Sequence, residues 1–265
     1  VFGLSGGLDS ALVAGILKYS LPRKKILALI MPERDSSPSS VSDAEIVANT
    51  FDIKTKFFDL TPVLSHFGIY EIVPNFFNTS FGRFMVSTLY RLLPKRSNPF
   101  ANAMFGTQRK WLRYVNAYYR IKHRTRMVSL YFVAEQLNYL VVSTANKTEA
   151  LTGFFVKFGD DCGDIAPIID LYKIEVRELS RHIGVPERII QKAPSPDLLP
   201  GMRDELALKL DYTTLDKVLS GLEKRFDFSE CARHAKVTPK TVEYVNSLVS
   251  RAEFMRNKAI TIEKE

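Results

Sequence analysis

The feature that most constrains this chain is a glycine-rich run directly behind an apolar segment at its start. Phe2 to Leu4 has the pattern of a buried strand, and the run Ser5-Gly6-Gly7-Leu8-Asp9-Ser10 follows it at once. Apolar residues then recur at helical spacing from Leu8 to Tyr19. A strand that leads through a tight turn into a helix places backbone N–H groups and the positive end of a helix dipole together. We therefore expect an anion-binding turn built into a sheet of parallel strands.

Strand and helix patterns continue to alternate along the chain. Further strands are predicted at Ile26 to Met31, Lys56 to Leu60 and Leu140 to Ser143. Helices are predicted at Asp43 to Phe51, where Ser42 can cap the start, and at Trp111 to Leu137, Lys147 to Val156, Tyr172 to Ile183, Thr213 to Leu222 and Thr238 to Arg256. This order indicates an α/β fold, a three-layer doubly wound parallel sheet with a helical C-terminal tail over 203–265. Ligands bind such a sheet at the carboxyl ends of its strands.

Residues 61–112 interrupt the alternation. Several phenylalanines fall there together with four prolines, Pro62, Pro74, Pro94 and Pro99. We therefore expect an irregular insertion over the sheet edge. A chain of 265 residues, 46% of them hydrophobic, is long enough for one large domain, which we take as 1–265. Because the chain opens on Val1 within a strand pattern and not on Met, the native N-terminal segment is expected to be missing.

The net charge of +8 is concentrated in one region. No acidic residue occurs between Glu71 and Glu135, whereas eleven lysines and arginines do. Such asymmetry indicates an anionic partner, which could be a nucleotide, a nucleic acid or an acidic membrane. No apolar run approaches the roughly 20 residues of a membrane helix, so we expect no membrane span. Two distant cysteines, Cys162 and Cys231, and four scattered histidines show no metal-ligand spacing and are typical of a reducing, cytoplasmic setting.

The residue types of the Ser5 to Ser10 run suit a phosphate group. Gly6 and Gly7 allow close backbone approach, and the two serines add hydroxyl donors. Asp9 supplies a carboxylate for Mg²⁺, which prefers one or two carboxylates beside phosphate oxygens. The Gly-Lys-Ser/Thr ending of the kinase and GTPase phosphate loop is absent. An ordinary glycine-rich turn with a capping serine is the alternative.

Two further clusters narrow the class of protein. The first runs from Ser143 through Thr144, Asn146 and Lys147 to Glu149 and is continued by Gly153 to Asp160, Asp164, Pro167 and Lys173. The second is the run Pro194 to Gly201. The Ser5 to Ser10 run resembles the loop of the N-type ATP pyrophosphatases, which implies the adenine nucleotide α-hydrolase-like fold. Together, the order and spacing of the clusters resemble the ammonia-type NAD synthetases of that superfamily. The resemblance is strong over residues 1–60 and 120–225 and weak over 61–112.

This resemblance implies an activity and a set of site residues. The activity is the amidation of deamido-NAD to NAD by ATP and ammonia through an acyl-adenylate, which releases AMP and pyrophosphate, in a homodimer joined partly through the Trp111 to Leu137 helix. ATP is expected on Ser5, Gly6, Gly7, Asp9, Ser10, Thr144, Lys173 and Ser195, Mg²⁺ on Asp9 and Glu149, and deamido-NAD on Arg126, Lys157 and Asp164. Asp9 and Lys173 are the catalytic candidates. For Lys173 the reason is that a compact cation suits the charge that grows on a leaving pyrophosphate.

The chain departs from the family's pattern at two places. Arg120 and His123 stand where Asn and Ala are common, ahead of the paired arginines. Near the C-terminus the chain has Glu253-Phe254-Met255-Arg256 where the family often carries His-Lys after a Glu. These departures bear on substrate affinity and on the contacts of the tail to the dinucleotide.

Two other functions stay open. A tRNA-modifying N-type ATP pyrophosphatase is favoured by the basic, aromatic-rich stretch from Phe76 to Arg126, because stacking rings among cations suit RNA. The Lys157 to Lys173 pattern and the lack of a sulfur-carrying cysteine pair speak against it. Val237 to Val242 resembles the entry of a DNA-binding helix-turn-helix, but a helical tail packed on the core explains the same spacing. Nucleic acid is therefore not expected as a partner.

Overall fold

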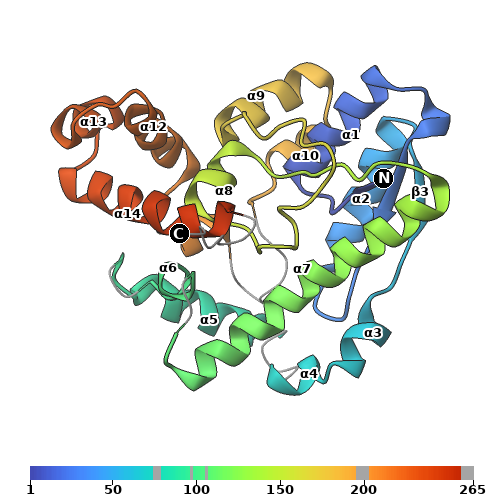
Figure 1. Cartoon of the computed structure of the whole chain (residues 1–265), viewed down its shortest axis with the longest axis horizontal. Helices are drawn as coiled ribbons and strands as arrows, with labels where there is room; N and C mark the ends of the chain where they lie inside the picture. Colours follow the sequence, from blue (N-terminus) through green and yellow to red (C-terminus); the bar gives the residue numbers. More distant parts are fainter. Residues whose placement is uncertain (74–78, 96–97, 105–106, 195–202, 258–265) are drawn as a thin grey trace, which may run out of the picture.

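A parallel sheet lies at the centre of the computed structural model, which describes residues 1–73, 79–95, 98–104, 107–194 and 203–257 (Figure 1). Its strands are β1 Phe2–Gly3, β2 Leu27–Ile30 and β3 Lys54–Phe57, paired in the order β1-β2-β3. Isolated parallel bridges from Phe2 to Val142 and from Val142 to Ile165 continue the sheet beyond β1. The first strand in sequence thus has later segments on both sides, and ligands of α/β sheets bind at such a switch point.

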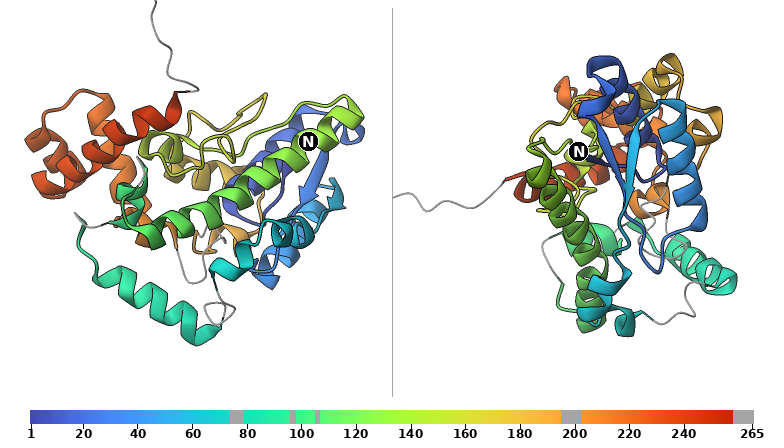
Figure 2. Two further views of the ribbon diagram at one scale, coloured as in Figure 1. Left: turned by 60° about the horizontal axis from the view of Figure 1, so that its bottom comes forward. Right: turned by 90° about the vertical axis from the view of Figure 1, so that its right-hand side faces the viewer.

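Helices cover both faces of this sheet (Figure 2). Because successive strand residues point to opposite faces, Ala28 and Ile30 pack in one apolar cluster and Leu29 packs in another. The first cluster includes residues of α1 Leu8–Ser20, α2 Pro38–Thr50, α9 Lys173–Ile183 and α10 Glu187–Ile190. The second is closed by α7 Lys110–Leu137, a long helix that crosses the other face. The predicted three-layer architecture is therefore present.

A second group of helices follows the sheet region in sequence. It comprises α8 Lys147–Thr152, α11 Asp204–Leu208, α12 Tyr212–Glu223, α13 Phe228–Ala235 and α14 Pro239–Arg256. Figure 1 shows α12, α13 and α14 gathered at one end of the molecule. They share an apolar cluster that includes Leu215, Val218, Cys231 and Val245. The described part of the predicted C-terminal tail is thus helical and packed, which accounts for the spacing of Val237 to Val242.

The segment 61–112 is not irregular as the prolines suggested, because its described part contains four helices. They are α3 Thr61–His66, α4 Ile69–Ile72, α5 Ser80–Leu92 and α6 Pro99–Ala103. Pro62 and Pro99 occupy the first turns of α3 and α6, where a missing N–H removes no helical hydrogen bond. Pro94 follows the end of α5. The start of α5 is capped by the Thr79 side chain, which accepts a hydrogen bond from the N–H of Gly82. These prolines therefore bound helices and do not replace them.

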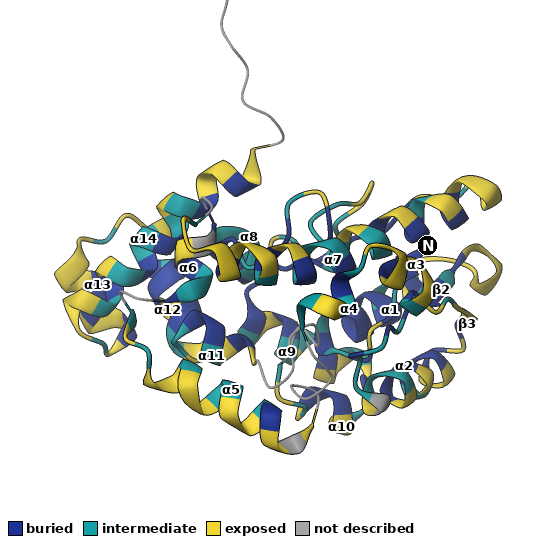
Figure 3. Ribbon diagram, turned by 90° about the horizontal axis from the view of Figure 1, so that it is seen from below, coloured by how far each residue is buried: buried dark blue, intermediate teal, exposed yellow. Residues whose placement is uncertain are grey.

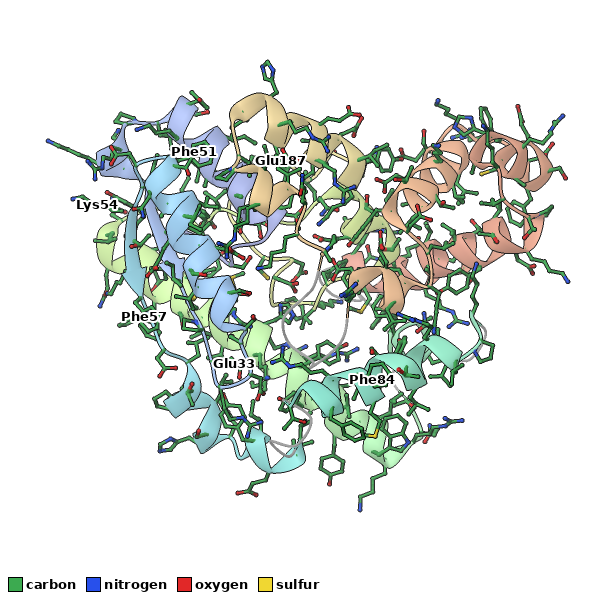
Figure 4. The ribbon with its side chains drawn as sticks, turned by 180° about the vertical axis from the view of Figure 1, so that it is seen from behind. Glu33, Phe51, Lys54, Phe57, Phe84 and Glu187 are labelled. Atoms are coloured by element: carbon green, nitrogen blue, oxygen red, sulfur yellow. The ribbon has the colours of Figure 1, made fainter. Side chains whose placement is uncertain are left out.

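The bounds of α2, α8 and β3 differ most from those expected. Helix α2 begins at Pro38, five residues before the predicted start, so Ser37 and not Ser42 is its N-cap residue. Helix α8 ends at Thr152 because Gly153 adopts φ 71°, the left-handed conformation that stops a helix. Strand β3 begins at Lys54 and lies at the outer edge of the sheet, where Figure 4 shows Lys54 and Phe57. All four of its residues are exposed, so apolar patterning gives little signal for its start.

A cluster of buried charges fixes α7 to the connection between β2 and α2. Lys122, completely buried, donates to Glu33 Oε1 over 3.0 Å and to Asp35 Oδ2 over 2.7 Å (Figure 4 labels Glu33). Tyr118 also donates to Asp35, and Arg34 pairs with it over 2.8 Å. Burial alone would raise the pKa of Asp35, but hydrogen bonds from Arg34, Lys122 and Tyr118 outweigh it and lower that pKa to about 2. The position of α7 thus depends on charge pairing as well as on apolar packing.

Candidate active site

The glycine-rich run folds as a tight turn between β1 and α1. Its serines hold it closed: Ser5 Oγ accepts from the N–H of Gly7 over 3.2 Å and lies 3.1 Å from Ser10 Oγ. Ser10 in turn donates to the carbonyl of Gly7 over 3.0 Å. Gly7 is the N-cap residue of α1 and has no side chain to cap it, so the first N–H groups of α1 keep the anion-binding character expected of this turn.

Gly6 is required by both backbone conformation and space. Its φ is 72°, and a Cβ at this position would meet Ser40 O at 2.4 Å, Asp43 Cβ at 2.8 Å and Ala44 N at 2.9 Å. The backbone atoms of α2 cannot yield without moving the helix. Helix α2 therefore packs against the turn through the space that the missing side chain leaves.

We expect Gly6→Ala to lower the free energy of unfolding by about 2 kcal/mol, since it adds backbone strain to a steric clash. The KM for ATP should rise about tenfold because the turn is displaced. Gly68→Ala is the matched control, since Gly68 has φ 66° with no atom within 4 Å of the added Cβ. Urea unfolding and steady-state kinetics of both variants test this. Equal effects of the two substitutions would show that the packing of α2 on the turn is unimportant.

Asp9, Glu149 and Lys173 meet beside this turn, although they come from three helices. Lys173 is buried at the first position of α9, and its Nζ lies 2.5 Å from Asp9 Oδ2 and 3.5 Å from Glu149 Oε1. Asn146, the N-cap residue of α8, donates to Asp9 Oδ1 over 2.9 Å and also accepts from the N–H of Glu149. The structure thus brings together the residues that the resemblance assigns to Mg²⁺ and to catalysis.

Burial and charge perturb this cluster strongly. Burial and the neighbouring Asp9 carboxylate raise the pKa of Glu149 to about 8. Burial also raises the pKa of Asp204, which accepts from Tyr212 over 2.9 Å, to about 6. For Lys173 burial alone would lower the pKa, but the charges of Asp9 and Glu149 prevail and raise it. The surroundings of Lys173 therefore carry more negative than positive charge when these carboxylates are ionised.

This excess of negative charge suits a divalent cation. Within the described ranges no group of three or more His, Cys, Asp or Glu residues is arranged to enclose a metal ion. Two carboxylates are nevertheless the donor set that Mg²⁺ takes when phosphate oxygens and water complete its shell. Asp9 and Glu149 fit that requirement.

Helix α12 holds Lys173 in place from behind. Asp216 of α12 accepts from Thr148 Oγ1 over 2.6 Å and from the N–H of Ile174 over 2.9 Å. Thr148 in turn accepts from the N–H of Lys173 over 3.0 Å. The first N–H groups of α9 are thus satisfied by buried side chains, which fixes the backbone from which Lys173 projects.

A cavity of about 850 Å³ opens in front of the turn and the carboxylate cluster. Of the predicted site residues, Ser5, Gly7, Asp9, Ser10, Arg126, Thr144, Glu149 and Lys173 line it. Gly6 supports the turn from outside the cavity wall, and Ser195 lies outside the described residues. Arg126 of α7 enters the cavity with its Nε donating to Met31 O over 3.3 Å. Six of the eight expected ATP residues and one expected substrate residue therefore share a single cavity.

Lys157 and Asp164 do not line this cavity. Asp164 is exposed, and accepts from the N–H of Val141 over 2.7 Å and from the Tyr131 hydroxyl over 3.3 Å. The Lys157 Nζ donates to the backbone oxygen of Phe254 over 3.3 Å and lies 4.8 Å from the centre of the Phe254 ring. The C-terminal helix, at the point where the chain departs from the family's His-Lys, thus contacts an expected substrate residue.

Several cavity-lining polar residues were not among the predicted site residues. His123 lies 3.1 Å from Asp160, and both line the cavity. Burial raises the pKa of Asp160 to about 7, whereas burial and the nearby Arg126, Lys122 and Arg124 lower that of His123 to about 3. Asp204 and Lys192 also line the cavity. Asp204 follows the Pro194 to Gly201 run closely, but no motif marks either residue.

A glycine-rich turn at the switch point of a parallel sheet, with a carboxylate and lysine cluster beside it, is the arrangement typical of a nucleotide-binding α/β protein. The chain belongs to the NAD synthase family, whose model matches residues 1–87 and 96–259. This confirms the resemblance and the enzyme class, a ligase, that the sequence predicts. It does not favour the tRNA-modifying alternative.

Relatives and solved structures agree with this assignment. The NH(3)-dependent NAD(+) synthetase of Thermotoga neapolitana is 41% identical, over 100% of this chain and 89% of the relative. The structure of NMN synthetase from Francisella tularensis matches with a TM-score of 0.70 and 26% identity, over 99% of this chain and 88% of that one. The NH3-dependent NAD synthetase from Campylobacter jejuni, in complex with nitrate, matches with a TM-score of 0.68 and 22% identity over the same shares. These structures confirm the predicted fold class.

Proposed function

We propose that this chain amidates deamido-NAD to NAD with ATP and ammonia, through an acyl-adenylate, and releases AMP and pyrophosphate. The observation that carries this proposal is the meeting of Asp9, Glu149 and Lys173 beside the phosphate-binding turn, in a cavity that Arg126 shares. Membership of the NAD synthase family and the NH(3)-dependent relatives support it.

The chemistry divides between two sides of the cavity. The nicotinate carboxylate attacks the α-phosphorus of ATP, and the bond to the bridging oxygen breaks. Lys173 and the N–H groups of the turn stabilise the charge that this oxygen gains as pyrophosphate leaves. Ammonia then attacks the acyl carbon of the adenylate, a proton is lost to solvent, and AMP departs. Arg126 holds the anionic substrate, so the protein acts mainly by positioning two anions and offsetting their repulsion.

Mg²⁺ belongs to this proposal as the metal held by Asp9 and Glu149. When bound it offsets the charge of the triphosphate and of the pyrophosphate product. The excess of carboxylates around Lys173 supports this assignment, as does the raised pKa of Glu149 to about 8, which comes from burial and from Asp9. A cation beside Glu149 would favour the ionised carboxylate that binds it.

A homodimer is part of the proposal. Helix α7 carries both buried and exposed positions along its length (Figure 3), and it leaves large apolar side chains exposed, among them Val128 at 68% and Phe132 at 52%. They occur on the helix that carries Tyr131, the partner of Asp164. A second copy packed on this face would cover these side chains and bring further groups to Asp164. Sedimentation or light scattering should give twice the mass of one chain, and Phe132→Glu should favour monomers.

Among the helices of the described residues, none has the length and hydropathy of a membrane-spanning segment. The cellular location and the source of nitrogen remain predictions. A cytoplasmic location agrees with the cysteine usage. Ammonia is the proposed nitrogen donor, either taken directly or delivered by another chain. Cys231 is buried in the apolar cluster of the C-terminal helices, which does not suit a nucleophile for glutamine hydrolysis.

A smaller substrate is the second candidate, because the Francisella tularensis structure with a TM-score of 0.70 is an NMN synthetase. That candidate reaction is the amidation of nicotinate mononucleotide. The two are separated by kcat/KM for each substrate under the same conditions. The cavity of about 850 Å³ is within the range of small-molecule sites and does not by itself choose between them.

The decisive assay combines purified protein with ATP, Mg²⁺, ammonium and either deamido-NAD or nicotinate mononucleotide. Equal amounts of NAD and AMP are expected with deamido-NAD, and none when glutamine replaces ammonium. AMP without NAD, or no product with either substrate, would contradict the proposal. Preference for the mononucleotide would replace deamido-NAD by the second candidate and keep the mechanism.

A further inference from the structure

A second charged cluster lies on the other side of the phosphate-binding turn. Its centre is Asp43 of α2, whose side chain is 3% exposed. Asp43 Oδ2 accepts from Lys192 Nζ over 2.8 Å, and Oδ1 lies 2.9 Å from Arg188 Nη2. The Arg188 contact is not aligned as a hydrogen bond, since Oδ1 has no hydrogen-bond partner among the described residues. One carboxylate thus faces two cations, and Lys192 is the better-bound of them.

This cluster touches the turn directly. The Cβ of Asp43 is one of the atoms that a side chain at Gly6 would meet, at 2.8 Å. Asp43 therefore lies directly against the backbone of the turn, and the residue it holds, Lys192, lines the cavity. The Lys192 side chain is 30% exposed, so its ammonium group is accessible to a ligand that enters the cavity.

The charges of the two clusters are opposite. Around Lys173 negative charge is in excess, which suits a metal ion, whereas Asp43 with Lys192 and Arg188 carries one net positive charge. Lys173 is paired with two carboxylates, so a triphosphate, which carries several negative charges, calls for a further cation besides Lys173. Arg188 stays beside Asp43 if Lys192 turns away, so the buried carboxylate does not become unpaired. The geometry therefore leaves Lys192 available to an anion on the turn.

We propose that Lys192 binds the pyrophosphate part of ATP, with Asp43 as the buried residue that positions it. This inference rests on the proposed function, because it assumes that ATP is the ligand of the turn. The ammonium of Lys192 exchanges its contact with Asp43 for a phosphate oxygen when the nucleotide binds. It thereby adds a cation from the segment after α10 to those of the turn and of α9.

The test compares Lys192→Gln and Lys192→Arg with Lys18→Gln. Lys18 is the matched control, since it also pairs with an aspartate, Asp52 at 3.8 Å, and its side chain is 34% exposed, but it does not line the cavity. Lys192→Gln should raise the KM for ATP and the inhibition constant of pyrophosphate on the order of 10- to 100-fold. The KM for deamido-NAD and the inhibition constant of AMP should stay within about twofold. Lys192→Arg should restore most of the loss, and Lys18→Gln should behave as wild type.

Two results would overturn the inference. One is unchanged inhibition by pyrophosphate in Lys192→Gln, and the other is an equal weakening for AMP and pyrophosphate, as a general distortion would give. Calorimetric titration of Mg²⁺-pyrophosphate into wild type, Lys192→Gln and Lys18→Gln provides the same comparison without turnover. Failure of wild type to make NAD would reject the proposed function, whereas this titration still decides whether Lys192 binds pyrophosphate.

Discussion

Lys173→Met is expected to lower kcat about 10³-fold, the loss typical of removing a group that stabilises transition-state charge. Methionine keeps the length and apolar stem of lysine and removes its charge. The bridging oxygen of the leaving pyrophosphate then lacks the buried cation that stabilises its charge. In the free protein the Nζ of Lys173 lies 2.5 Å from Asp9 Oδ2 and 3.5 Å from Glu149 Oε1. The pKa of Glu149, raised to about 8 by burial and by Asp9, should rise further, so that protonation relieves the repulsion and the variant stays folded near neutral pH.

Lys147→Met is the control for this substitution. Lys147 also begins a helix and pairs with a carboxylate, Glu223 at 2.8 Å, but it does not line the cavity. Single-turnover kinetics should show the loss in the adenylation step for Lys173→Met, with little change in Lys147→Met. Circular dichroism should show both variants folded. A kcat within tenfold of wild type for Lys173→Met would remove Lys173 from the mechanism.

The second large effect is a pH dependence of stability that Glu149 imposes. Burial and Asp9 raise its pKa to about 8 in the folded protein, against about 4.3 in an unfolded chain. A raised carboxyl pKa means that the folded state binds the proton more tightly, so this contribution to stability is complete below about pH 4.3 and is lost as pH rises through 8. Without Mg²⁺, the contribution of Glu149 to the free energy of unfolding should therefore decrease by on the order of a few kcal/mol between pH 4.5 and 9.

Glu149→Gln should remove the Glu149 share of this dependence, because glutamine does not titrate, whereas Asp160 and Asp204, whose pKa values are raised to about 7 and 6, keep theirs. It should also lower kcat at least 100-fold, since the expected metal site loses a carboxylate. In wild type, Mg²⁺ binding must displace the proton of Glu149, so the apparent Mg²⁺ affinity should increase with pH up to about 8. Urea unfolding and Mg²⁺ titrations from pH 5 to 9 test both effects. Glu223→Gln is the control, and a wild-type stability that does not change over this range would contradict the assignment.

The parts of the fold that sequence predicted are those with local causes. The turn from Ser5 to Ser10 is recognisable because glycines, hydroxyls and the start of an apolar helix fall within six residues. The strands at Phe2 and at Leu27 to Ile30 are buried on both faces and therefore read as continuous apolar runs. Glu149 and Lys173 were placed through resemblance, because nothing in their spacing shows that they meet Asp9.

The parts that were missed depend on long-range pairing. Lys122 and Asp35 are 87 residues apart, and Lys192 and Asp43 are 149 residues apart. A lysine that will be buried against a carboxylate has the same local sequence signal as one on the surface. Helices α3 and α6 differ from the predicted irregular segment for another reason, since Pro62 and Pro99 suit both a break and the first turn of a helix. Contacts with residues far away in the sequence decide which lysines are buried and which prolines start helices. The local pattern of a single sequence does not predict those contacts.

The contact between Lys157 and Phe254 has a consequence for biosynthesis. Residues expected at the site lie far apart in the chain, and one of them, Lys157, is held by the backbone of Phe254, which follows it by 97 residues. A nascent chain that ends before α14 therefore lacks the backbone carbonyl that holds Lys157. The arrangement around Lys157 is completed only after this last described helix has been synthesised.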